Sequence, residues 1–194
     1  MTVGGTPEKT TALSAEDLAR LGAIREALLD PSPRRIGRLD QWGLADEYET
    51  YTEVAQYREV SIAGADGAKL DVALSVPLNP APGQPYPAVI LPAPPISNGY
   101  LAYLDVFPRW ARNDYVVLDY SRRDPADSTG GTRVAGPQDV ADAIAVVDWL
   151  AEHVDVDPDR IGFFVSSDGF GASLLSSAKD RRIKAMAKSD VPWG

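Results

Sequence analysis

The residues best suited to chemistry are two adjacent serines, Ser166 and Ser167, which follow the apolar run 161–165 and precede Gly169. Ser167 stands where a buried strand is expected to turn sharply into a helix, with a small residue two positions later. Such a turn exposes a serine hydroxyl as the nucleophile of acyl transfer. A polar turn that merely caps the following helix is the alternative interpretation. The order of the surrounding elements favours the nucleophile position for Ser167.

A serine hydroxyl becomes a useful nucleophile only when a base removes its proton. The chain has one histidine, His153, in the segment that precedes the strand 161–165. That strand is about 16 Å long at about 3.3 Å per residue, so His153 and Ser167 are expected at its opposite ends. The sequence therefore predicts that His153 is a surface residue at a helix end, where the helix dipole favours it, and not the catalytic base.

Composition excludes several classes of site and partner. A chain of 194 residues can form one domain with a sizeable core. A formal net charge of −9 argues against a nucleic-acid partner. The absence of cysteine excludes disulfides and thiolate metal sites, and a single histidine excludes a site built on several histidines. We expect no metal and no cofactor.

The sequence also bears on location. No run approaches the roughly 20 apolar residues that a membrane-spanning helix needs. The segment 1–14 is polar and lacks the apolar centre of a secretory signal. We therefore expect a cytoplasmic protein with no membrane partner.

The N-terminal part of the chain is predicted to form a helical arm. Ser14 to Asp17 resembles a capping box, and Leu18, Leu21 and Ile24 follow at helical spacing. The helix should end near Pro31, because the residue before a proline avoids helical conformation. We predict an arm over residues 1–50 that packs on a main domain over residues 51–194.

The main domain is predicted to be an α/β structure that begins with a β-hairpin around residues 64–67. Strands and helices alternate after the hairpin, which favours a mostly parallel sheet covered by helices on both faces. The expected strands are 57–62, 70–76, 88–91, 115–118, 161–165 and 183–187, and the expected helices are 101–112, 137–150 and 169–178.

This order of elements, with a serine turn after the fifth strand, resembles the α/β-hydrolase superfamily. The similarity is greatest to the branch of Xaa-Pro dipeptidyl-peptidase-like and dienelactone-hydrolase-like proteins, and it extends over residues 55–194. The stretches that carry it are 120–131, 136–150, 156–162 and 182–185. The resemblance implies the N-terminal portion of an α/β-hydrolase fold, without the C-terminal strands.

The resemblance also implies roles for three residues. Ser167 would be the nucleophile, and the backbone N–H groups of Asp168 and Ile96 would stabilise the oxyanion. Ile96 is chosen because relatives with a Pro-Gly-Phe-like loop place a donor there; a rigid proline corner with no catalytic part is the alternative for that loop. Val165 departs from the family, which usually has glycine at this position, and the side chain of Asp168 must point away from the developing negative charge.

Five further residues are assigned structural roles. Asp190 follows the last predicted strand, which is one strand too early for the acid of a catalytic triad. Arg123 usually ties loops together in relatives, so we expect it to form a salt bridge. The three aromatic residues Tyr103, Trp110 and Trp149 are expected to serve packing.

Three functions follow as hypotheses. The first is a serine hydrolase that acts on a small ester or peptide substrate, weakly active or inactive as this chain. The second is a non-catalytic α/β-hydrolase-like binding or scaffold protein, and the third is a related acyltransferase. In the family, the acid and the histidine follow later strands. The strand 183–187 would then be an uncovered edge, which predicts an incomplete domain, self-association or a partner chain.

Overall fold

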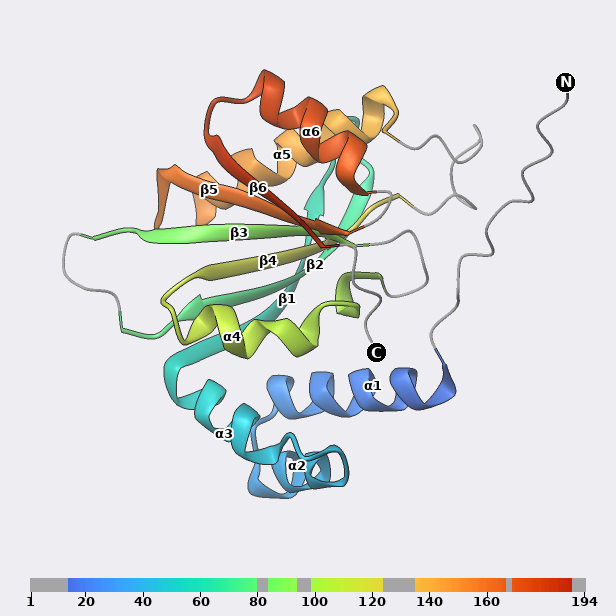
Figure 1. Cartoon of the computed structure of the whole chain (residues 1–194), viewed down its shortest axis with the longest axis vertical. Helices are drawn as coiled ribbons and strands as arrows, with labels where there is room; N and C mark the ends of the chain where they lie inside the picture. The colour runs from blue at the N-terminus through green and yellow to red at the C-terminus, as the bar shows by residue number, and fades with distance from the viewer. Residues whose placement is uncertain (1–13, 80–83, 94–98, 124–134, 167–168, 190–194) are drawn as a thin grey trace, which may run out of the picture.

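The computed structural model describes residues 14–79, 84–93, 99–123, 135–166 and 169–189. These residues form a six-stranded mixed sheet with helices on both faces (Figure 1), which confirms the predicted fold class. The strands lie in the order β1-β2-β4-β3-β5-β6. Their bounds are β1 Ala55–Ala63, β2 Lys69–Pro77, β3 Tyr86–Ala93, β4 Val116–Ser121, β5 Val156–Ser166 and β6 Ile183–Ser189.

Two kinds of strand pairing make up the sheet. The predicted hairpin is present, with β1 antiparallel to β2, and Gly67 adopts a φ of 83° in its turn. Strand β2 then pairs antiparallel with β4, whereas β4, β3, β5 and β6 are mutually parallel. The carboxyl ends of the four parallel strands therefore meet at one edge, where open α/β sheets place their ligands.

Helices α5 (Pro137–His153) and α6 (Gly169–Lys179) cover one face of the sheet (Figure 1). Pro137 stands at the start of α5, where its missing N–H would have no helical partner. The buried side chains of Ala143, Val147 and Leu150 belong to one apolar cluster with residues of all six strands. This packing follows the helical spacing seen in the sequence.

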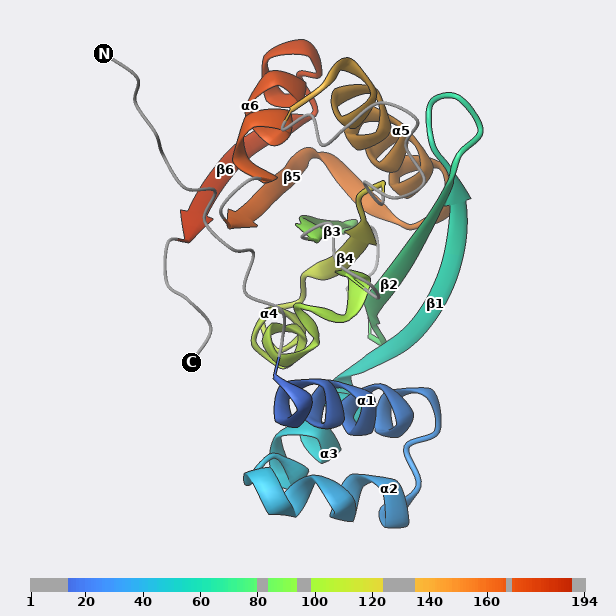
Figure 2. The ribbon, with the colours of Figure 1, turned by 90° about the vertical axis from the view of Figure 1, so that its right-hand side faces the viewer.

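The opposite face is covered by α4 (Phe107–Ala111) and by the N-terminal helices (Figure 2). The latter are α1 (Ala15–Leu29), α2 (Pro33–Gly37), η1 (Arg38–Trp42) and α3 (Ala45–Val54). Ser14 caps α1 through the predicted capping box with Asp17. Helix α1 also docks on β1, because Arg25 donates two hydrogen bonds of 2.6 Å to Glu59. The domain boundary at residue 50 lies within α3 and stays a prediction.

The predicted helix over residues 101–112 is wrong in extent. The structure has two short 3₁₀ turns, η2 (Gly99–Leu101) and η3 (Leu104–Val106), before α4 begins at Phe107. Pro108 explains the difference, because proline lacks an N–H and fits only in the first turn of a helix. Tyr103 consequently lies between the two 3₁₀ turns instead of in a helix.

Strand β6 is the last strand at one side of the sheet and, among the described strands, pairs only with β5 (Figure 2). Its side chains Lys184 and Lys188 are exposed. Charged residues of this kind protect natural sheet edges from pairing with other chains. Association through β6 stays a prediction, and the two lysines weigh against pairing with a second copy.

Candidate functional site

The candidate site lies at the carboxyl edge of the parallel strands, where β5 ends at Ser166 and α6 begins at Gly169. The chain thus passes from strand to helix at the place expected for a nucleophile turn. Ser167 and Asp168 lie outside the described residues, as does Ile96, the other expected oxyanion donor. Their catalytic roles stay predictions. Asp190, which the sequence assigned a structural role, also lies outside the described residues.

Ser166, the last residue of β5, forms a side-chain hydrogen bond with Tyr103. The Tyr103 Oη and Ser166 Oγ atoms are 2.7 Å apart, and either hydroxyl can donate. Tyr103 packs in the core as the sequence predicted, and its side chain is only 1% exposed. Its polar contact was missed, because the two residues are 63 positions apart in the chain.

The segment that carries Tyr103 is held to its neighbours on both sides. The backbone N–H of Tyr100 donates to Ser121 Oγ at the end of β4, over 3.2 Å. The hydroxyl of Tyr48 in α3 donates to the backbone carbonyl of Leu104, over 2.9 Å. Tyr103 therefore reaches Ser166 from a segment whose flanking residues are fixed.

A buried acid lies close to this segment. Asp119 of β4 is 0% exposed, and among the described residues neither oxygen of its carboxyl group has a hydrogen-bond partner at normal distance. Burial raises the pKa of Asp119 well above its ordinary value; the backbone N–H of Tyr103 lowers it to a smaller extent, and the nearby Asp105 raises it further. Asp119 is therefore a candidate for a carboxylic acid that stays protonated inside the fold.

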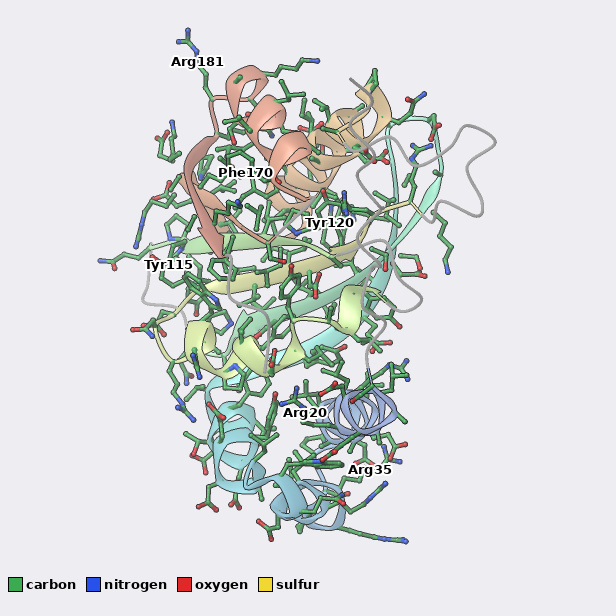
Figure 3. The ribbon with its side chains drawn as sticks, turned by 45° about the vertical axis from the view of Figure 1, so that its right-hand side comes forward. Arg20, Arg35, Tyr115, Tyr120, Phe170 and Arg181 are labelled. Carbon is green, nitrogen blue, oxygen red and sulfur yellow. The ribbon has the colours of Figure 1, made fainter. Side chains whose placement is uncertain are left out.

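Two residues beside the turn take part in packing. Val165 is fully buried among the residues that α5 and α6 cover, so its branched side chain points into the core. Phe170, in the first turn of α6, lies beneath the Lys188 ammonium, which is 5.5 Å from the ring centroid (Figure 3). This cation–π contact joins the start of α6 to β6.

His153 lies at the surface at the end of α5, as the sequence predicted. Its ring stacks on Trp149, with ring centroids 4.9 Å apart, and its Nδ1 is 2.9 Å from the Trp149 backbone carbonyl oxygen. Strand β5 begins three residues after His153 and runs 11 residues to Ser166. His153 is therefore not placed to take a proton at the turn after β5.

Arg123 follows β4 and holds three elements together. Its guanidinium donates to both carboxylate oxygens of Asp142 in α5, over 2.5 and 2.8 Å, and to both oxygens of Asp66 in the β1–β2 turn. Asp142 Oδ1 also accepts from the backbone N–H of Ala65. The hydrogen bonds that Arg123 donates to Asp66 lower the pKa of Asp66 to about 2. The contacts are those of the structural salt bridge that the resemblance implied.

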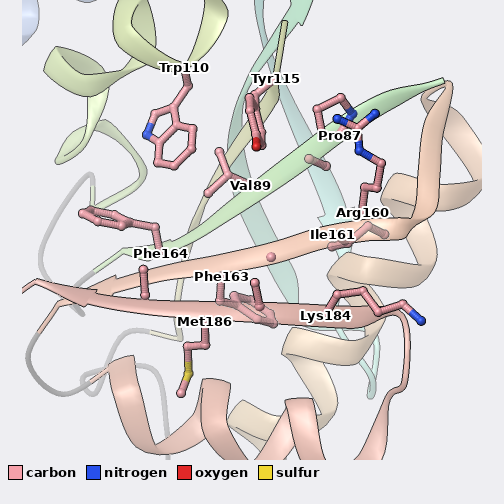
Figure 4. Close-up of a pocket in the computed structure, with 14 residues that line it drawn as sticks. Pro87, Val89, Trp110, Tyr115, Arg160, Ile161, Phe163, Phe164, Lys184 and Met186 are labelled. Atoms are coloured by element: carbon pink, nitrogen blue, oxygen red, sulfur yellow. The ribbon is translucent and has the colours of Figure 1, made fainter. Parts of the chain in front are cut away.

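A cavity of about 340 Å³ lies on the open part of the sheet face that carries α4 (Figure 4). Its walls are mostly apolar, and two cationic side chains, Arg160 and Lys184, line it as well. Neither Ser166 nor Gly169, the described residues on either side of the turn after β5, lines it. Its apolar lining residues include Val89, Trp110, Tyr115 and Phe164.

The described residues contain neither a candidate metal site nor a candidate membrane-spanning helix. Within these ranges, no three His, Asp or Glu side chains are grouped so that they could hold a metal ion. No helix in the same ranges has both the length and the apolar character needed to cross a membrane.

Solved structures with the same fold support the α/β-hydrolase resemblance. A hypothetical protein from Pseudomonas aeruginosa is 26% identical with a TM-score of 0.54, over 69% of this chain and 42% of that one. The carboxylesterase EstE1, cloned from a metagenomic library, is 20% identical with a TM-score of 0.55, over 90% of this chain and 54% of that one. A puromycin-hydrolyzing peptidase from Mycobacterium tuberculosis is 22% identical with a TM-score of 0.52, over 69% of this chain and 22% of that one. The chain thus spans about half or less of these proteins.

Comparison with protein families gives a match over most of the chain. The family model of X-Pro dipeptidyl-peptidase (S15 family) matches residues 66–193, which include β2 to β6 and the turn after β5. A search of curated proteins found no match. The family match agrees with the order of strands and helices and with the resemblance found in the sequence. The chain belongs to the X-Pro dipeptidyl-peptidase (S15) family.

Proposed function

We propose that this chain carries the nucleophile of a serine hydrolase that acts on small ester or peptide substrates. The observation that supports this most directly is the passage from strand to helix at the carboxyl edge of the parallel strands, where β5 ends at Ser166 and α6 begins at Gly169. The family match includes this turn. The names of two structural neighbours, a carboxylesterase and a puromycin-hydrolyzing peptidase, agree with the same class of substrate.

The proposed chemistry proceeds through an acyl-serine. A base takes the proton of Ser167, and the serine oxygen forms a bond to the carbonyl carbon of the substrate. The backbone N–H groups of Asp168 and Ile96 hold the negative oxygen that develops. The carbonyl then re-forms as the alcohol or amine leaves with the proton, and water releases the acid by the same steps in reverse. His153 is not placed to supply the base, so we expect weak or no turnover by this chain alone.

The position of His153 favours one alternative. A chain with the turn but no base near it could serve as a non-catalytic binding or scaffold protein that keeps the hydrolase fold. The two hypotheses differ in whether the Ser167 hydroxyl reacts with an electrophile. A fold alone does not decide between them.

A fluorophosphonate probe, with imidazole added as an external base, separates these hypotheses. We expect covalent labelling of the chain at Ser167, faster with imidazole than without it, because imidazole can take the proton that His153 cannot reach. The His153→Gln variant should be labelled at the wild-type rate. Mass spectrometry of proteolytic fragments identifies the labelled residue.

The Ser167→Ala variant is the matched control and should lose the label while it keeps the far-UV spectrum of the wild type. Failure to label a folded wild-type sample, with imidazole present, would contradict the hydrolase proposal and favour the binding protein. Labelling at a residue other than Ser167 would contradict the assigned nucleophile.

A further inference from the structure

The hydrogen bond between Tyr103 and Ser166 places a buried hydroxyl one residue before the proposed nucleophile. We propose that Tyr103 is a positioning residue, which fixes the end of β5 and thereby sets where the Ser167 hydroxyl stands. This inference rests on the proposed function. The contact that carries the inference is with Ser166, so Tyr103 is assigned a positioning role and not a catalytic one.

The end of β5 needs such support, because its backbone pairing with β3 stops before its pairing with β6 does. The register between β3 and β5 ends at the pair Ile90 and Phe163, whereas the register between β5 and β6 continues to Ser166. In the described residues, the last three positions of β5 are therefore paired with β6 alone. The Tyr103 hydroxyl holds the side chain of the last of them, over 2.7 Å.

Tyr103 is itself rigidly placed. Its ring is 1% exposed and belongs to the apolar cluster that includes residues of α1, α3 and α4. The residues on either side of it are fixed by the Tyr100–Ser121 and Tyr48–Leu104 hydrogen bonds, to β4 and α3 respectively. Because the Tyr103 ring is buried and packed, its hydroxyl group cannot shift along with Ser166. The hydrogen bond therefore holds the Ser166 side chain in place.

Positioning matters for acyl transfer because the rate depends steeply on the approach of the nucleophile to the carbonyl carbon. Loss of the Tyr103 hydroxyl leaves the core packing intact but releases the Ser166 side chain. We expect the rate of the covalent step to fall about fivefold, the factor that one ordinary hydrogen bond supplies. A residue that only positions the nucleophile should leave the affinity for the probe unchanged.

A second tyrosine provides a matched control. Tyr51 Oη donates to Ser75 Oγ over 2.7 Å, and both residues are fully buried. Tyr51 belongs to the same apolar cluster as Tyr103. The Tyr51→Phe variant therefore loses the same kind of bond within the same apolar cluster, but near the C-terminal end of β2, where Ser75 pairs with Val117 at the start of β4.

The experiment compares Tyr103→Phe, Ser166→Ala, the double variant and Tyr51→Phe by the kinetics of fluorophosphonate labelling in imidazole. We expect Tyr103→Phe and Ser166→Ala each to slow the covalent step about fivefold at unchanged probe affinity, and the double variant to be no slower than either. Tyr51→Phe should lower the melting temperature as much as Tyr103→Phe does, but it should be labelled at the wild-type rate.

Hydrogen exchange of the backbone amides of residues 164–166 gives a readout that does not depend on reactivity. We expect Tyr103→Phe to speed this exchange severalfold, whereas Tyr51→Phe should not change it. If the wild type is labelled, the labelling rate tests the positioning role. A wild-type rate for Tyr103→Phe then overturns the inference. If the wild type is not labelled, the proposed function fails, and hydrogen exchange alone tests the positioning role. Equal exchange of residues 164–166 in Tyr103→Phe and Tyr51→Phe then overturns that role.

Discussion

Replacement of Arg123 by alanine is expected to lower the free energy of unfolding by about 3 kcal/mol or more. The reason is the carboxylate of Asp142, whose side chain is only 4% exposed and which takes two charge-assisted hydrogen bonds from Arg123. Without the guanidinium, this buried charge keeps only the backbone N–H of Ala65. An unpaired buried charge is far more costly than a lost surface ion pair. Denaturant unfolding followed by circular dichroism measures the difference.

Two variants make the test specific. Asp66→Asn removes the exposed partner of Arg123, so its effect should be much smaller than that of Arg123→Ala. Adding Asp142→Asn to Arg123→Ala should recover part of the loss, because it removes the unpaired charge. Equal and small losses for Arg123→Ala and Asp66→Asn would show that Asp142 is not the group that makes Arg123 important.

The Arg123 contacts and the Tyr103 contact show how the carboxyl edge of the sheet is organised. Arg123 ties the end of β4 to α5 and to the β1–β2 turn, and Tyr103 ties the segment after β3 to the end of β5. Both side chains join segments that are distant in the chain. The candidate site is thus held from the hairpin side and from the side of the N-terminal helices.

Local sequence patterns predicted most of the elements. Pro137 and the helical spacing after it predicted α5, and the glycines between two alternating runs predicted the hairpin. The continuous apolar runs predicted β3, β4 and β5, because strands buried on both faces show no alternation. The family and the fold class followed from the order of these elements, and both are confirmed.

The elements and contacts that the sequence did not predict correctly have physical causes as well. Residues 101–112 carry helical spacing, but Pro108 restricts the helix to the few residues that begin at Phe107. Helices α2 and α3 were missed, because the charged stretch between Pro31 and Thr50 gave no clear apolar spacing. The hydrogen bond of Tyr103 with Ser166 was not predicted, because it joins residues 63 positions apart, which only the order of strands in space brings together.

The candidate site is predicted from the sequence only in part. The strand and helix on either side of Ser167 stand where expected, and His153 lies at the surface as expected. The roles of Ser167, Asp168 and Ile96 stay predictions. No local pattern indicated that a tyrosine would support the turn, because its hydroxyl contact depends on how the segment after β3 packs against β5.

The second large effect concerns Asp119, whose carboxyl group is buried without a hydrogen-bond partner at normal distance among the described residues. Burial raises its pKa in the folded chain well above the unfolded value of 3.8, although the backbone N–H groups of Tyr103 and Tyr120 oppose this. Above pH 4 the unfolded chain loses this proton while the folded chain keeps it. The contribution of Asp119 to the free energy of unfolding therefore falls as the pH rises, by about 1.4 kcal/mol for each pH unit, until the pH reaches the pKa of the folded chain.

The Asp119→Asn variant isolates this contribution, because asparagine has a similar shape and does not titrate. The difference in free energy of unfolding, wild type minus variant, should fall as the pH rises above 4, and measurements at pH 5 and pH 6 follow this fall. Asp105, whose pKa is also raised by burial, and its neighbour Arg20 are present in both proteins, so their contributions cancel to first order. The exposed Asp40→Asn controls for the loss of a carboxyl group outside the core. A difference that stays constant over this range would mean that Asp119 is already ionised in the folded chain. The buried surroundings of Asp119 would then hold a negative charge.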